Sequence, residues 1–204
     1  MSGGMLWPVG RVGGAYDTPD QWTHFTGLLK AGIAGIRSAV PPGDSVRIIL
    51  HFSQGGDAGA TRWFLDHLNA YGVPYDLLGL SYYPWWHGSI AGLRGNLAVV
   101  AQAYGIDVMV VETSYPWRSG RWEGLGVDST AMVWPITAQG QERFLRDVVA
   151  AVAAMPGGHG QGVLWWYPEA IPVSGLFVFA GGSLALFDSS GDVLQAASAL
   201  RTTP

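Results

Sequence analysis

The sequence contains no cysteine among its 204 residues. This excludes disulfides, thiolate nucleophiles and cysteine-ligated zinc, and it leaves the redox compartment undecided. Charged residues make up only 13% of the chain, the net charge is −4, and no run of basic residues occurs. Such a chain is poorly suited to bind nucleic acid or an anionic membrane, so we expect a neutral substrate.

Long apolar runs are also missing. No window of about 18 uninterrupted apolar residues occurs, so no membrane span is expected. The N-terminus lacks the basic, apolar and small-residue order of a signal peptide. Because 49% of the residues are hydrophobic, the chain should nevertheless bury a core and fold.

Tryptophan, by contrast, is abundant, with ten residues in the chain. Flat aromatic rings bind the apolar faces of sugars, so tryptophans near strand ends indicate carbohydrate binding. From the sequence alone, each single tryptophan fits a packing role as well as a sugar-binding one.

Helical and strand patterns alternate along the chain. Apolar residues at helical spacing predict helices over 20–39, 58–71, 89–104, 138–155 and 193–201. Apolar and β-branched runs predict strands over 46–51, 76–82, 107–112 and 162–166. This order implies a parallel sheet covered by helices, either doubly wound or a (β/α)8 barrel. No glycine fingerprint for a nucleotide follows any strand, which weakens the nucleotide-binding alternative.

Polar and aromatic side chains gather where the predicted strands end. They are His51, Ser81, Tyr82, Tyr83, Glu112, Trp165 and Trp166. Barrel enzymes build their active sites on this C-terminal face of the strands. Only four strands are predicted, however, so the chain would form about half of an eight-stranded barrel.

Glu112 is the strongest candidate for chemistry. The apolar run 108–111 brings it to a strand end, directly before Thr-Ser-Tyr-Pro-Trp at 113–117. A glycosidase nucleophile needs a carboxylate held rigidly at the mouth of a pocket, and a strand end supplies that rigidity. Spacing alone gives about equal weight to a carboxylate that caps a turn. Glu123 and Glu142 are assigned to solvated surface.

These segments resemble glycoside hydrolase family 53, the endo-β-1,4-galactanases. Residues 79–88, Gly-Leu-Ser-Tyr-Tyr-Pro-Trp-Trp-His-Gly, are similar to the end of that family's sixth strand, and Val-Val-Glu-Thr-Ser-Tyr-Pro-Trp at 110–117 to the seventh. Gly-Met-Leu-Trp-Pro at 4–8 resembles the loop after the fourth strand. Gly-Gly-Asp at 55–57 and Arg-Trp-Phe at 62–64 resemble the segment after the fifth.

The resemblance implies an α/β fold, a (β/α)8 TIM barrel of the clan A glycosidase type, of which this chain holds about strands 5–8. Residues 1–204 would be a single partial catalytic domain. The implied reaction is endo-acting, retaining hydrolysis of β-1,4-galactosidic bonds in galactan or arabinogalactan, with Glu112 as nucleophile. The family's acid/base glutamate would lie immediately before Met1. We therefore expect Met1 to be an internal methionine or a fragment start, and the chain alone to have little or no activity.

The resemblance also implies the residues that contact substrate. They are Trp7, His51, Asp57, Tyr82, Tyr83, Trp85, Trp86, His87, Trp117 and Trp166. Adjacent strand residues face opposite ways, so only one of Tyr82 and Tyr83 should reach Glu112, and only one of Trp165 and Trp166 should face the site.

Several of these assignments compete with structural roles or depart from the family pattern. Asp57 is as readily a helix N-cap, and a lone histidine such as His51 is slightly more often structural. The family's Asp-Asn after this histidine is Ser-Gln at 53–54, which puts the polar contacts of that loop in doubt. The family's Trp-Glu-Pro after the eighth strand is Trp-Tyr-Pro-Glu at 166–169, so no role is carried onto Glu169.

No cofactor or metal is expected. Some bacterial relatives hold calcium between the seventh and eighth strands, but residues 118–140 offer only Glu123 and Asp128, too few oxygen ligands. The implied partner is the polysaccharide, and the full-length parent is expected to be a secreted monomer. The alternatives are a non-catalytic galactan-binding remnant, a gene fragment without function, and a related barrel hydrolase acting on another β-glycan.

Overall fold

The computed structural model describes residues 8–120 and 129–200. One sheet contains the parallel strands β1 (Ile49–Phe52), β2 (Leu77–Tyr82), β3 (Asp107–Thr113) and β4 (Gly160–Trp165), in sequence order. A doubly wound sheet reverses its strand order at a switch point. The unbroken order found here is instead that of consecutive strands in a barrel wall.

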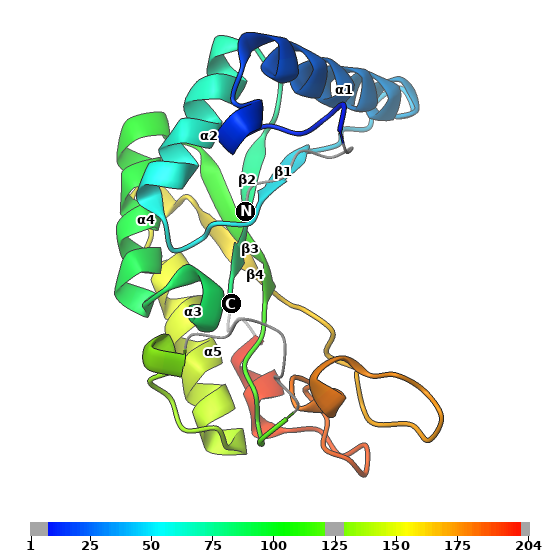
Figure 1. Ribbon diagram of the computed structural model, residues 1–204, viewed down its shortest axis with the longest axis vertical. Coiled ribbons are helices and arrows are strands. Elements are labelled where there is room, and N and C mark those ends of the chain that lie inside the picture. The colour runs from blue at the N-terminus through cyan, green and yellow to red at the C-terminus, as the bar shows by residue number, and fades with distance from the viewer. Residues whose placement is uncertain (1–7, 121–128, 201–204) are drawn as a thin grey trace.

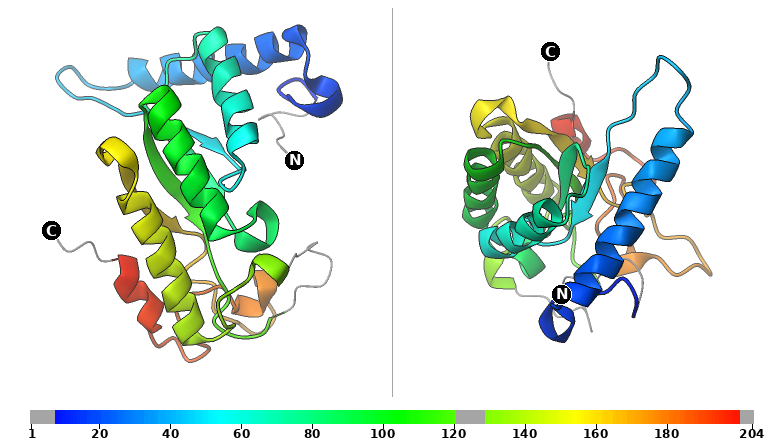
Figure 2. Two further views of the ribbon diagram at one scale, coloured as in Figure 1. Left: turned by 90° about the vertical axis from the view of Figure 1, so that its left-hand side faces the viewer. Right: turned by 90° about the horizontal axis from the view of Figure 1, so that it is seen from above.

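Helices precede and connect the strands. They are α1 (Pro19–Ser38), α2 (Ala58–Ala70), α4 (Ile90–Tyr104) and α5 (Ala138–Ala153). Figure 1 shows α2, α4 and α5 on one side of the sheet and an open, concave opposite side. Figure 2 shows α4 and α5 side by side, with α1 lying apart at the β1 end. Among the described helices, none is long and apolar enough to cross a membrane.

Short polar side chains fix where the long helices begin. The N-cap side chains accept a hydrogen bond from a backbone N–H three residues further on, at Thr18, Asp57, Ser89 and Thr137. Such caps satisfy amide groups that have no partner inside the helix. Each cap therefore fixes the residue at which its helix begins.

The core lies between the sheet and its helices. Leu78 and Leu80 of β2 and Val108 and Val110 of β3 point to the helix side and are fully buried, and α5 contributes the equally buried Phe144. The residues of alternate parity face the other way. This open face carries exposed apolar side chains: Ile49 is 40% exposed and Leu164 is 52% exposed.

Three expectations about secondary structure need correction. The first strand begins at Ile49 rather than at residue 46, and an additional short helix, α3 (Pro84–His87), follows β2. The last helix is the 3-10 helix η5 (Gln195–Leu200) instead of a longer helix from 193. Val193 forms an antiparallel bridge with Phe187, so a helix cannot start there.

Candidate active site

Glu112 faces the open side of the sheet because β3 contains a β-bulge. Leu80 of β2 pairs with Val110, but the next residue, Ser81, pairs with Glu112, so Val111 is an extra residue. The pairing of β3 with β4 shifts over the same segment. Strict alternation would place Glu112 on the helix side together with Val110. The bulge turns its side chain to the other face.

A glycine makes room for this bulge. A Cβ atom on Gly79 would lie 2.9 Å from side-chain atoms of both Ile49 and Val111. The two side chains thus fill the space in front of Gly79 on the open face. Val111 and Glu112 therefore lie on the same face although they are neighbours in sequence.

Residues of β1, of β2 and of the position after β2 contact the Glu112 carboxylate. Tyr83 Oη donates a hydrogen bond of 2.7 Å to Oε1, and Ser81 Oγ donates one of 3.3 Å to Oε2. His51 Nε2 lies 3.6 Å from Oε2 and 2.6 Å from Ser81 Oγ. The Glu112 side chain is 29% exposed, so its charge is stabilised by these groups and partly by solvent.

The structure distinguishes the two tyrosines. Tyr83 continues the open-face parity of Ser81 and reaches Glu112. Burial raises the pKa of Tyr83, and the hydrogen bond and charge of Glu112 raise it further, so the phenol remains a proton donor. Tyr82 is fully buried on the helix side, where its Oη donates to Gly88 O at 3.0 Å and its ring stacks on Phe144. The expected substrate contact of Tyr82 is therefore corrected to a core role.

The two tryptophans at the end of β4 divide in the same way. Trp165 is buried, donates through Nε1 to Leu184 O at 2.9 Å, and packs edge-on against Phe144. Trp166 faces the open side, and its ring makes edge-to-face contacts with Tyr83 and Phe179.

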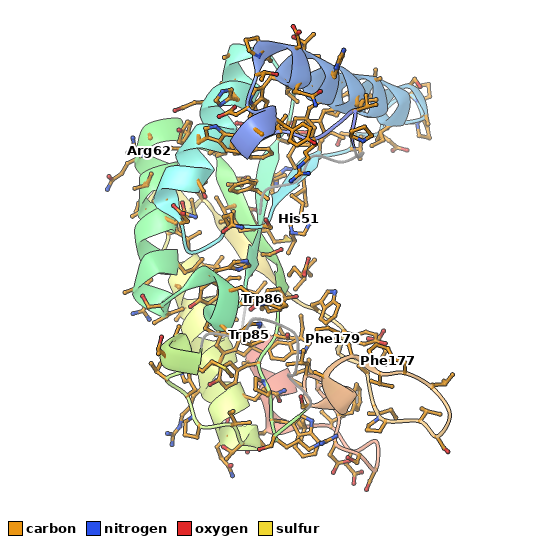
Figure 3. All side chains as sticks on the ribbon, in the orientation of Figure 1. His51, Arg62, Trp85, Trp86, Phe177 and Phe179 are labelled. Carbon is orange, nitrogen blue, oxygen red and sulfur yellow. The ribbon has the colours of Figure 1, made fainter. Side chains whose placement is uncertain are left out.

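A pocket of about 220 Å³ lies beside Glu112. Its lining residues are Tyr83, Trp85, Trp86, Glu112, Trp166, Phe179 and Leu184. Pockets for drug-sized ligands usually measure about 300–1,000 Å³, so this one suits a smaller group such as a single sugar ring. Figure 3 shows Trp86, Phe179 and His51 on the concave side of the molecule.

The helix α3 contributes one side of the pocket. Trp86 is 43% exposed, whereas Trp85 is buried, and both side chains line the pocket. His87 Nδ1 accepts a hydrogen bond of 3.0 Å from the Tyr83 backbone N–H. Burial lowers the pKa of His87 to about 4, against the opposing charge of Glu112, so the ring is neutral near pH 7. His87 thereby holds the turn that carries Tyr83.

The remaining described candidates, Asp57, Trp117 and Glu142, do not line the pocket. The Asp57 carboxylate caps α2 through the Ala60 N–H at 2.9 Å, and Asp57 does not line the pocket. Trp117 donates through Nε1 to Gly182 O at 3.3 Å and joins the loops that follow β3 and β4. Glu142 pairs with Arg146 on the surface of α5. Trp7, Glu123 and Asp128 lie outside the described residues.

The sequence places Ser81 at a strand end but assigns it no role, although it lies two residues before Tyr83 and so shares its face. Two residues of the site were not predicted at all. Phe179 and Leu184 belong to the irregular chain after β4, where no periodicity reveals which side chains turn inward.

The described part of the site contains few acidic groups. Glu112 is the only carboxylate among the described residues that line the pocket. Within residues 8–120 and 129–200, no group of three or more histidine or acidic residues could hold a metal ion.

The chain is similar in sequence to curated proteins. An uncharacterized protein in the bgaB 5' region of Niallia circulans is 40% identical over 97% of this chain and 56% of its own length. Endo-beta-1,4-galactanase of Bacillus subtilis strain 168 is 34% identical over 83% of this chain and 40% of its own length. The chain thus spans about half the length of these curated relatives.

Solved structures show the same architecture. The GH53 catalytic domain of Ignisphaera aggregans matches with a TM-score of 0.80 and 29% identity, over 97% of this chain and 55% of that domain. The catalytic core of a xylanase A matches with a TM-score of 0.62 and 16% identity, over 95% of this chain and 59% of that core, which shows the fold alone. The model of glycosyl hydrolase family 53 matches residues 1–200. The chain belongs to glycosyl hydrolase family 53, and its parallel α/β fold is about half of a TIM barrel.

Proposed function

We propose that the whole protein is an endo-acting glycosidase that hydrolyses β-1,4-galactosidic bonds in galactan and arabinogalactan with retention. Residues 1–204 are one partial catalytic domain of it. The observation that carries this proposal is the Glu112 carboxylate, bound by Tyr83 at the edge of an aromatic pocket. The name of the Bacillus subtilis relative, an endo-beta-1,4-galactanase, supports the substrate class.

In this function Glu112 is the nucleophile. A carboxylate oxygen attacks the anomeric carbon, a bond between enzyme and sugar forms, and the glycosidic C–O bond breaks. Hydrogen bonds from Tyr83 and Ser81 hold the two carboxylate oxygens. The rings of Trp86 and Trp166 offer apolar surface to a sugar ring.

Retention needs a second carboxyl group about 5–5.5 Å from the nucleophile, protonated so that it can donate to the leaving oxygen. Glu112 is alone among the described pocket-lining residues in carrying a carboxylate. The proton donor of the whole protein therefore comes from outside these lining residues. The 204-residue chain should hydrolyse galactan slowly or not at all.

The same observation favours a second candidate, a galactan-binding function without catalysis. An aromatic pocket with one carboxylate can hold a sugar without cleaving the bond beside it. This function requires galactan binding but no covalent bond between Glu112 and a sugar.

The proposal extends to the setting of the whole protein. Its partner is the polysaccharide, and it acts as an exported monomer. It needs no cofactor, because attack by a carboxylate and protonation of the leaving oxygen require side chains only.

A covalent trapping experiment separates the two functions even without an acid. The reagent is a 2-deoxy-2-fluoro-β-galactoside with a dinitrophenolate leaving group. Dinitrophenolate departs without protonation, and the fluorine slows the later hydrolysis of the bond between sugar and enzyme. We expect the chain to gain the mass of one fluorogalactosyl group on the peptide that contains Glu112. The Glu112→Gln variant should stay unlabelled.

Other outcomes decide against catalysis or against the assigned residue. A chain that is retarded in galactan gels but never labelled is a binding protein. Labelling of another carboxylate would refute the assignment of Glu112. Release of reducing ends from β-1,4-galactan by the 204-residue chain alone would show that some other group serves as the acid.

A further inference from the structure

His51, Ser81 and Glu112 form a connected series across three neighbouring strands. Ser81 Oγ lies 2.6 Å from His51 Nε2 and 3.3 Å from Glu112 Oε2. The direct distance from His51 Nε2 to Glu112 Oε2 is 3.6 Å, too long for a normal hydrogen bond. Ser81 is therefore the link between the histidine and the carboxylate.

The serine hydroxyl has a single proton, so it can donate to only one neighbour at a time. If that proton pointed to His51 Nε2, Glu112 Oε2 would lose its donor. If Nε2 carries the ring proton and donates to Ser81, the serine proton is free for the carboxylate. A charged acceptor makes the stronger hydrogen bond, so Glu112 selects the second arrangement.

We propose that Ser81 is a positioning residue for Glu112, which receives a hydrogen bond from His51 Nε2 and donates one to Glu112 Oε2. This inference rests on the proposed role of Glu112 as nucleophile. Tyr83 already fixes Oε1, but a single contact leaves the carboxylate free to turn about it. The second donor fixes the plane of the carboxylate, and Ser81 is only 4% exposed, so solvent cannot easily replace it.

The titratable groups around Glu112 are few in the described part of the chain. His51 approaches from β1 and Tyr83 from the end of β2, and the charge of Glu112 acts on the pKa of His87 in α3. Tyr83 stays protonated and His87 stays neutral near pH 7. His51 is the neighbour in direct contact with the Ser81 hydroxyl, and with a proton on Nε2 it leaves the serine proton for Glu112.

The test compares the labelling of Glu112 by the fluorosugar in four proteins: the unaltered chain, Ser81→Ala, Ser81→Thr and Thr26→Val. Ser81→Ala should lower the maximal labelling rate about tenfold, with an unchanged half-saturating sugar concentration. Ser81→Thr keeps the hydroxyl and should restore most of the rate. Thr26→Val removes a buried hydroxyl of α1 that bonds only to backbone carbonyls, and should label normally.

The outcomes separate this inference from the proposed function. Normal labelling of Ser81→Ala, with Glu112 labelled in the unaltered chain, would overturn the inference and leave the nucleophile in place. If the unaltered chain is not labelled, the proposed function fails. In that case 15N NMR of the His51 ring tests the hydrogen bond from His51 to Ser81 by itself. The inference requires a proton on Nε2 whose signal shifts in Ser81→Ala and not in Ser81→Thr; a proton on Nδ1 instead would overturn it.

Discussion

Tyr83 Oη donates a 2.7 Å hydrogen bond to Glu112 Oε1, whereas the adjacent Tyr82 donates to Gly88 O on the opposite face of the sheet. The pair is a matched test of the site. Tyr83→Phe should slow labelling of Glu112 about 10- to 100-fold, because a hydrogen bond to a charged group is worth about 1.5–3 kcal/mol. Tyr82→Phe should lower the melting temperature and leave labelling unchanged. Equal slowing in both variants would indicate general damage to the fold.

Trp86 should contribute to sugar binding through its exposed ring face. We expect Trp86→Ala to weaken retardation in galactan gels about tenfold, since an aromatic contact contributes about 0.5–1.5 kcal/mol beyond the buried area. The control is Trp63→Phe. Trp63 hydrogen-bonds Asp17 and does not line the pocket, so this variant should bind galactan normally. Unchanged retardation of Trp86→Ala would remove this residue from the sugar site.

Gly56 holds the loop after β1 against α3. A Cβ atom there would lie 1.7 Å from the backbone oxygen of His87, so Gly56→Ala must push the two segments apart. The expected loss of stability is about 1–3 kcal/mol. Gly27→Ala, in the open on α1, should instead stabilise by about 0.5–1 kcal/mol. Thermal denaturation followed by circular dichroism measures both, and a neutral Gly56→Ala would contradict this close approach.

The sequence predicts the order of the elements well, because apolar periodicity reflects which faces are buried. The strand ends at His51, Tyr83 and Glu112 were identified in this way. The side of the sheet on which each side chain lies could not be predicted for β3. Its bulge depends on pairing with β2 and β4 together, and no local pattern encodes it.

The chain after β4 was the least predictable part. Apolar residues near 193–201 suggest a full helix, but Val193 and Leu194 are engaged in backbone contacts with Phe187 and Leu186. Such long-range pairing overrides local helical preference. The pocket residue Phe179 was missed for the same reason, since its position depends on contacts with Trp166 and other distant residues.

The Asp17 carboxylate should make the folded chain less stable as the pH falls into the acid range. Its carboxylate accepts hydrogen bonds from the Trp22 and Trp63 indoles at 2.7 and 3.0 Å, and the Trp22 bond is the largest cause of its lowered pKa. A lowered folded-state pKa gives stability that is present above pH about 4 and is lost as pH falls through the folded value.

Melting temperatures measured between about pH 2 and pH 6 would test this linkage. Asp17→Asn should flatten the acid side of the curve relative to the unaltered chain. Asp44→Asn, in the turn before β1, serves as the control and should keep the full dependence. A curve for Asp17→Asn that falls as steeply as the original would refute the assigned role.

The open face of the sheet should promote association. Ile49 and Leu164 are exposed there, and β1 and β4 are the outer strands of the described sheet. We expect concentration-dependent association in sedimentation velocity, reduced by Ile49→Lys with Leu164→Lys. Val133→Lys, at a more exposed apolar site outside the sheet, should have little effect. A monomer at all concentrations would contradict this expectation.

Because of the extra residue in β3, the chemistry of this chain depends on the length of that strand as well as on which residues it contains. Deleting Val111 would leave the stretch from 112 to 117 unchanged in every letter, yet it would rotate Glu112 into the packing beneath the helices. A comparison of motifs would still recognise the family, while the carboxylate faced away from any sugar. For inherited or engineered variants, single-residue length changes within β3 are therefore more informative than the survival of its signature residues.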